Sequence, residues 1–161
     1  MRIGILGTGR MAAIHAAALR SHSGVELVVG SVDTQRARAF GRDNGIARHG
    51  TYDDVLSDGL DAVVVATHTH LHAAQLREAL PLGVPVFCEK PLTLDIPSSR
   101  DLVDAYATAG RQLQGGFHRR FDAGRAARAA GAAVGRRASA RGGHARAARG
   151  EAQVPVPGTG D

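Results

Sequence analysis

Apolar residues in the first 120 positions form two alternating patterns. Short segments rich in Val, Ile and Leu are separated by longer segments in which apolar side chains recur every three or four positions. The short segments predict parallel strands covered on both faces, and the longer ones predict amphipathic helices. We expect the strands at residues 3–6, 26–32, 60–66, 84–88 and 112–117. This alternation predicts an open parallel sheet with right-handed crossovers, which is the doubly wound α/β, or Rossmann, class.

The predicted helices have sequence signals at their ends. Asn44-Gly45 is a turn signal after a helix at about residues 34–43, and Asp95 with Pro97 opens a helix that stops at Gly110. Further helices are expected directly after the first strand, at residues 52–56 and at about residues 71–80. The side chains expected to face the sheet are Met11, Ile14 and Ala18 in the first helix, Ala73, Leu76 and Leu80 in the helix at 71–80, and Leu102, Val103 and Tyr106 in the last.

The first predicted strand runs into a glycine-rich turn and then into an Ala-rich helix, the order that a dinucleotide-binding βαβ unit requires. Gly7 permits the tight turn, Gly9 lets a pyrophosphate approach the backbone, and the small Ala12 replaces the usual third glycine where helix packs on strand. The pyrophosphate would bind the free N–H groups at the positive end of the helix. We therefore expect it to be held by Gly7, Thr8, Gly9, Arg10 and Met11. A purely structural turn is the alternative.

An acidic residue follows the second predicted strand. Asp33 lies 21 residues beyond Ala12, where a carboxylate can accept both ribose hydroxyls of the adenosine half and repel a 2′-phosphate. This favours NAD over NADP, although Arg36 and Arg38 keep NADP as an alternative. Asp33 could also serve as the N-cap of the helix that begins at Thr34.

Glu89-Lys90-Pro91 lies just past a predicted core strand, where ligands of such sheets bind. Lys90 is the only lysine among 20 basic residues. An ammonium group can hold and polarise a substrate hydroxyl as hydride leaves the carbon, so Lys90 is the candidate catalytic residue. An ordinary surface loop is the alternative.

Several motifs together resemble one family of oxidoreductases. They are Gly7-Thr8-Gly9, Asp33, Ala66-Thr67, Leu71-His72, Cys88-Glu89-Lys90-Pro91-Leu92 and Gly116-Phe117-His118-Arg119-Arg120-Phe121-Asp122. In this combination they are similar to the Gfo/Idh/MocA oxidoreductases, which include glucose-fructose oxidoreductase and inositol 2-dehydrogenases. The resemblance covers about residues 1–122 and implies an N-terminal Rossmann domain that binds NAD or NADP. It also implies that Lys90 contacts the substrate and relays its proton, and that Glu89, Thr67 and His72 lie near the nicotinamide.

Two other groups of residues invite a chemical interpretation. His68, His70 and His72 alternate, but no carboxylate or cysteine joins them at ligand spacing, so we expect no metal site. Cys88 has no base beside it in sequence and is expected to be a buried small hydrophobe rather than a nucleophile.

The family resemblance also implies a second, α+β domain that supplies the substrate pocket and a later catalytic Asp and His. In this chain 25 of the 29 residues from Asp122 to Gly150 are Ala, Arg or Gly. Because such a segment has almost nothing to bury, we expect residues 1–121 to form the Rossmann domain and residues 122–161 to be a poorly ordered remnant of the second domain. Loss of reading frame in GC-rich DNA would produce this mixture, and a genuine basic tail is the alternative.

Charge and composition bear on whether the chain binds nucleic acid and on its cellular compartment. The net charge is +5, but residues 1–121 carry 13 basic and 12 acidic side chains, so the excess belongs to the tail. With 4% aromatic residues and no Trp, the chain lacks the stacking side chains of a single-strand binder. A salt-dependent contact of the Arg-rich tail with nucleic acid is the third and weakest hypothesis. One cysteine and no membrane-length apolar run favour a cytoplasmic protein.

These observations predict an NAD-dependent oxidoreductase, and the family resemblance implies that it acts on a CH–OH group of a polyol or sugar, including an inositol-like substrate. The alternative is a catalytically incomplete nucleotide-binding fragment or sensor module without the substrate domain. A homo-oligomer is expected only with that second domain present.

Overall fold

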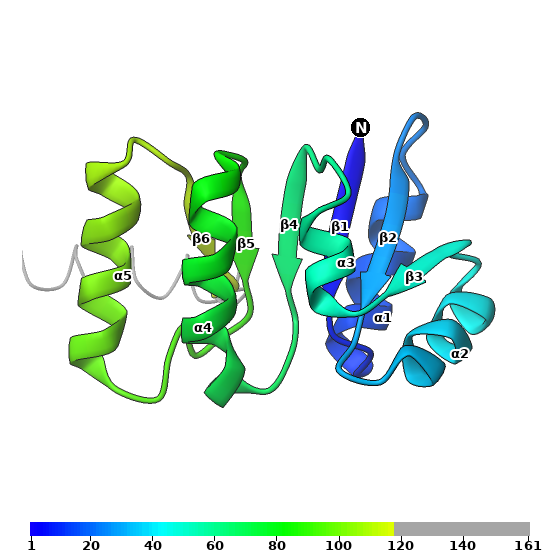
Figure 1. Cartoon of the computed structure of the whole chain (residues 1–161), viewed down its shortest axis with the longest axis horizontal. Coiled ribbons are helices and arrows are strands. Elements are labelled where there is room, and N and C mark those ends of the chain that lie inside the picture. Colours follow the sequence, from blue (N-terminus) through cyan, green and yellow to red (C-terminus); the bar gives the residue numbers. More distant parts are fainter. Residues whose placement is uncertain (118–161) are drawn as a thin grey trace, which may run out of the picture. The chain divides into compact units, whose positions relative to one another are not determined.

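The computed structural model describes residues 1–117, which form a three-layer α/β unit (Figure 1). The strands are β1 (Arg2–Leu6), β2 (Glu26–Gly30), β3 (Arg48–Gly50), β4 (Ala62–Val65), β5 (Val86–Cys88) and β6 (Leu113–Gly115). The helices are α1 (Arg10–Arg20), α2 (Thr34–Asn44), α3 (Tyr52–Leu56), α4 (Thr69–Ala79) and α5 (Ile96–Thr108), with a 3₁₀ turn η1 at Leu80–Leu82. The remnant of a second domain that we expected at residues 122–161 lies outside the described residues, and so do residues 118–121.

All six strands pair in parallel, in the order β3-β2-β1-β4-β5-β6. The chain builds outward from β1 to β3 and then returns to place β4 on the other side of β1. The strand order therefore reverses between β1 and β4, which is the point where ligands of doubly wound sheets bind. The predicted fold class is confirmed.

Helices cover both faces of the sheet, so there are two apolar layers. Figure 1 shows α3 and α4 on the near side of the sheet and α1 on the far side. The far layer packs Ile5 and Val29 from the strands against Ala12 and Ala16 of α1. The near layer centres on Val63, Val65, Leu76, Leu102 and Tyr106, and the Tyr106 hydroxyl donates to the Leu76 carbonyl at 2.8 Å. Burial on both faces explains why the strands are nearly continuous apolar runs.

The face that α1 presents to the sheet differs from the prediction. Ala12 and Ala16 are fully buried, whereas Ile14 is 51% exposed and Ala18 is also exposed. The two alanines allow the helix axis to approach the sheet closely, so small side chains rather than large ones form the contact. In α5, Leu102 and Tyr106 are buried as expected, but Val103 is exposed, which corrects that prediction as well.

The sequence pattern also missed β3. This strand is three residues long, lies at the edge of the sheet and exposes Arg48 and His49. An edge strand with polar side chains carries no apolar period, so the pattern contained no signal for it.

Three helices begin with a side-chain cap. Asp33 accepts from the Gln35 and Arg36 amides at the start of α2, Asp95 accepts from the Ser98 amide at the start of α5, and Thr51 forms a capping box with Asp54 in α3. Helices α1 and α4 have no side-chain cap. None of the helices within residues 1–117 has the length and apolar character needed to cross a membrane.

Candidate functional site

A cleft of about 420 Å³ opens at the carboxyl end of the sheet, at the reversal of strand order between β1 and β4. Its walls come from the segments that follow β1, β2, β4 and β5 and from the start of α3. The lining residues are Gly7, Thr8, Gly9, Arg10, Met11, Ser31, Val32, Arg36, Tyr52, Ala66, Thr67, His68, Leu71, Glu89 and Lys90. Segments that are far apart in the sequence thus meet in one place because parallel strands end at the same edge.

Gly7 forms the tight turn out of β1. Its φ angle is +116°, and a Cβ there would lie 2.6 Å from the carbonyl oxygen of Ala66. The Gly7 amide donates to the Gly30 carbonyl at 2.9 Å, which ties the turn to β2. A side chain at this position would meet both backbone strain and the main chain that follows β4. The role predicted for Gly7 in the turn is confirmed.

The N-terminus of α1 faces the cleft without a cap. Gly9 is the N-cap residue, with extended backbone and no side chain to accept from the first turn, and that turn contains no acidic residue. A Cβ built on Gly9 would meet no heavy atom within 4 Å. Helix N-termini with free N–H groups and a positive dipole end bind anions. The geometry therefore fits a phosphate-bearing ligand over Gly9, Arg10 and Met11.

Asp33 is the N-cap of α2. Its Oδ1 accepts from the Gln35 amide at 2.8 Å and from the Arg36 amide at 3.4 Å, and the Arg36 guanidinium lies 3.7 Å from Oδ2. The side chain is half exposed, and Asp33 does not line the cleft, although Val32 and Arg36 do. The capping role is observed, and the ribose contact stays a prediction.

Glu89 and Lys90 line the cleft and directly follow β5. The Glu89 carboxylate is buried, with one oxygen 2.8 Å from Nε2 of His15 in α1 and the other accepting from the Lys90 amide at 3.2 Å. Lys90 itself is exposed, lines the cleft and precedes a cis peptide bond to Pro91. An exposed ammonium group thus lines the cleft, on a backbone amide that is hydrogen-bonded to a buried carboxylate.

Thr67 and His72 have different surroundings. Thr67 lines the cleft and donates its hydroxyl to Oε1 of Gln75 at 2.6 Å. His72 is 1% exposed and does not line the cleft; its ring nitrogens lie 3.0 Å from the Pro91 carbonyl and 3.1 Å from the Thr67 carbonyl. His72 therefore holds the two turns together, and a direct contact with nicotinamide stays a prediction.

The alternating histidines do not converge. The His68 and His70 rings stack at 5.9 Å between centroids, whereas His72 is turned into the protein. Within residues 1–117 no three side chains of the His, Cys, Asp or Glu type gather as a metal-binding group.

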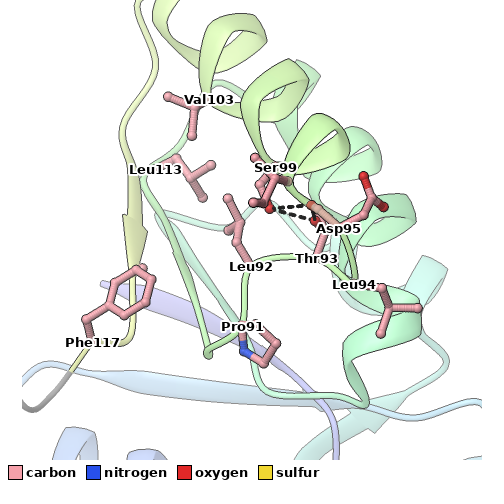
Figure 2. Close-up of a pocket in the computed structure, with 11 residues that line it drawn as sticks. Pro91, Leu92, Thr93, Leu94, Asp95, Ser99, Val103, Leu113 and Phe117 are labelled. Atoms are coloured by element: carbon pink, nitrogen blue, oxygen red, sulfur yellow. Dashed lines mark hydrogen bonds between the residues drawn. The ribbon is translucent and has the colours of Figure 1, made fainter.

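A second cavity, of about 450 Å³, is lined by residues 91–96 and by side chains of α5 and β6 (Figure 2). Leu92, Val103, Leu113 and Phe117 give it an apolar wall. At its polar end the Thr93 hydroxyl lies 2.6 Å from both the Asp95 carbonyl and the Ser99 hydroxyl, as the dashed lines show. This cavity lacks an uncapped helix end, so it does not offer the anion site of the first cleft.

Comparison with known proteins identifies the fold family. A family model described as an oxidoreductase family with an NAD-binding Rossmann fold matches residues 1–117. The chain belongs to the Gfo/Idh/MocA family. That assignment confirms the resemblance carried by the glycine turn and the Glu89-Lys90-Pro91 segment, and the NAD-binding description of the matched model bears out NAD as the predicted cofactor.

Relatives named inositol dehydrogenase are represented by one sequence and one solved structure. Inositol 2-dehydrogenase 4 of Saccharopolyspora erythraea is 42% identical over 127 residues, which are 76% of this chain and 38% of the relative. The structure of myo-inositol dehydrogenase from Lactobacillus casei, in complex with NAD(H) and myo-inositol, is 32% identical, with a TM-score of 0.71 over 77% of this chain and 38% of that one. The chain thus spans a little over a third of the relatives that it matches.

The same fold also serves other substrates. Biliverdin reductase from Synechocystis, whose structure contains biliverdin and NADP⁺, is 28% identical, with a TM-score of 0.64 over 71% of this chain and 37% of that one. The Gfo/Idh/MocA fold alone therefore does not determine the substrate.

Sequence reasoning missed several residues of this Gfo/Idh/MocA cleft. Ser31 directly follows β2, so the rule that ligands bind at the carboxyl ends of strands could have found it. Tyr52 had no such signal, because it belongs to a helix that had no predicted role. His15 had none either: it lies outside the cleft lining and meets Glu89 across 74 positions.

Cys88 of this domain is fully buried, as expected. Burial, together with the neighbouring Glu89 charge, raises the pKa of its thiol to about 12. Because the thiolate is the reactive form, we expect Cys88 to resist thiol reagents at pH 8 in the folded chain and to react promptly in denaturant. Counting free thiols with a chromogenic disulfide reagent in both states tests this, and equal rates in the two states would contradict it.

Proposed function

We propose that residues 1–117 form the cofactor half of an NAD-dependent oxidoreductase that acts on a CH–OH group of a polyol or sugar. The observation that carries the proposal is the meeting, in one cleft, of an uncapped helix N-terminus and the chain's only lysine. The relatives named inositol dehydrogenase support a polyol as the substrate class. The buried, unpaired thiol of Cys88 suits a reducing compartment, so we place the protein in the cytoplasm.

The cofactor would lie across the carboxyl ends of β1 and β4. Its pyrophosphate would bind the amides of Gly9, Arg10 and Met11, where no side chain competes for them. The adenosine ribose would approach the end of β2, where Asp33 and Arg36 meet. NAD, when bound, supplies the hydride acceptor, and Thr67 and Glu89 line the remaining length of the cleft.

Lys90 would hold the reacting hydroxyl. Its neutral amine would accept the hydroxyl proton as the C–H bond breaks and the hydride passes to the cofactor, and the ammonium so formed would donate a hydrogen bond to the new carbonyl oxygen. Its exposure leaves the amino group free to reach a substrate, while the backbone on which it stands is held by Glu89. A lysine can give and take a proton in a way that an arginine cannot.

Two substitutions at Asp33 separate its capping role from cofactor choice. Asp33→Ala should lower NAD affinity by about 1.5 to 3 kcal/mol, because a hydrogen bond to a charged group is lost. It should also lower the free energy of unfolding by about 1 kcal/mol, through loss of the cap. Asp33→Asn keeps a cap but not the charge, so it should retain stability and still shift the preference towards NADP.

The measurement is titration of both variants and the parent with NAD and with NADP, alongside thermal unfolding. Equal affinity of the parent chain for the two cofactors would contradict the role assigned to Asp33. If Asp33→Asn leaves the preference for NAD over NADP unchanged, the role of Asp33 is limited to capping α2.

A nucleotide-binding module without turnover is the second candidate. The matched part of the chain is an NAD-binding domain, and that domain alone would be enough for this candidate. Both candidates bind NAD. Only the oxidoreductase reduces NAD when a substrate domain is present.

A further inference from the structure

His15 lies on α1, the helix whose N-terminus opens on the cleft, and it contacts the segment that carries Lys90. Its Nε2 is 2.8 Å from Oε1 of Glu89, and the two side chains are 22% and 8% exposed. The His15 ring also packs edge-on against Phe87, with 5.0 Å between the ring centroids. A partly buried hydrogen bond thus joins α1 to the end of β5.

Glu89 also contacts the backbone of Lys90. Its second oxygen accepts from the Lys90 amide at 3.2 Å, so the one carboxylate bridges His15 and the Lys90 backbone. Two further side chains hold the same loop: His72 of α4 at the Pro91 carbonyl, and Ser99 of α5 at Thr93. Both belong to helices on the near face of the sheet, and His15 belongs to α1 on the far face.

We propose that His15 is a positioning residue that acts through Glu89 to fix the backbone of Lys90 relative to the N-terminal turn of α1. The inference rests on the proposed function of the same cleft. The cofactor's pyrophosphate and the lysine would then be located from one rigid helix, with about one and a half turns between Gly9 and His15. Hydride transfer depends on placing reacting groups to within a fraction of an ångström, which is what such a connection provides.

A packing role is the competing explanation, because His15 also contacts the Phe87 ring. Two substitutions divide the alternatives. His15→Phe keeps an aromatic ring against Phe87 and removes the nitrogen, whereas His15→Gln removes the ring and places an amide nitrogen at a similar reach from Cβ. His22, which is exposed on the turn after α1, offers His22→Ala as a matched control.

Lys90 supplies a selective probe, since it is the only lysine of the chain. Selective ¹⁵N-lysine labelling of the 161-residue chain gives one backbone amide signal, and that amide is the one donated to Glu89. In the absence of cofactor, we expect its hydrogen exchange to quicken by about tenfold or more in His15→Phe and to stay within about threefold of the parent in His15→Gln and His22→Ala.

Amides of the central strands, followed on uniformly labelled samples, report global opening. If Lys90 keeps its protection in His15→Phe, or loses it only in His15→Gln, the ring packing is what matters and the proposal fails. It also fails if exchange at Lys90 and in the central strands quickens equally in His15→Phe, because the effect is then one of overall stability.

NAD titrations of the same samples keep this test separate from the proposed function. A parent chain that binds no NAD but shows the expected exchange pattern would overturn the proposed function and leave the positioning of Lys90 by His15 standing. If the parent chain binds NAD but His15→Phe leaves hydrogen exchange at the Lys90 amide unchanged, the proposed function stands and the positioning role of His15 is overturned.

Discussion

Gly9→Asp is expected to weaken NAD binding by about a hundredfold or more while leaving the fold as stable as before. Gly9 has the extended backbone of an N-cap residue and open space around its Cα, so an aspartate fits without strain. Its carboxylate would accept from the first-turn amides and stabilise α1 by a few tenths of a kcal/mol or more. The same carboxylate would occupy the place of the pyrophosphate and repel it.

Gly7→Ala is the matched control, because it is expected to destabilise the fold, whereas Gly9→Asp is expected to leave the fold stable. Its Cβ would lie 2.6 Å from the Ala66 carbonyl oxygen at a φ of +116°. We expect it to lower the free energy of unfolding by about 1 to 3 kcal/mol or more. Thermal unfolding and NAD titration of the two variants measure both effects. A Gly9→Asp chain that is stable and still binds NAD with parental affinity would remove the α1 N-terminus from the cofactor site.

The second large effect concerns turnover. Hydride transfer needs a substrate carbon held against the nicotinamide as well as a group that takes the hydroxyl proton. The 127 residues that match inositol 2-dehydrogenase 4 cover 38% of that relative, so we expect a sample of residues 1–161 alone to show no dehydrogenase activity with inositols or simple sugars. Fusing residues 1–117 to the remaining part of such a relative should give an active enzyme.

In that fusion, Lys90→Met should lower kcat by about 10²- to 10⁴-fold, the usual contribution of a positioned acid–base group. Lys90→Arg is the control, because it keeps the positive charge but does not release its proton at neutral pH. We expect Lys90→Arg to retain a near-parental KM and to lose most of kcat. An active fusion whose rate survives Lys90→Met would exclude Lys90 from the mechanism, and rapid NADH formation by the unfused chain would contradict the need for a second part.

The fold was predictable because its central strands are unbroken apolar runs and its turns are marked by glycine and proline. The run at residues 60–66 could only be a buried strand or a short buried helix segment, and the alternation along the chain decided for the strand. The buried face of α1 was not predictable from spacing, because Ile14 fits the helical period but faces solvent. Close packing against the sheet selects the smallest side chains, which are Ala12 and Ala16.

The cofactor end of the cleft was predictable from local sequence, since Gly7 and Gly9 act through their own backbone geometry. The contacts around Lys90 were not predictable from local sequence. His15 and His72 reach Glu89 and the Pro91 carbonyl across 74 and 19 positions, and only the folded sheet brings them together. Asp33 shows the remaining limit, because a carboxylate after β2 can cap a helix and contact a ribose, and one sequence position predicts both.

The central claim is that the cleft between β1 and β4 binds NAD, and calorimetric titration of the 161-residue chain with NAD tests it most directly. We predict weak, saturable binding with one NAD per chain, a lower affinity for NADP, and no measurable heat of binding with Gly9→Asp. Absence of saturable NAD binding by a chain shown to be folded, or undiminished binding by Gly9→Asp, would contradict the account.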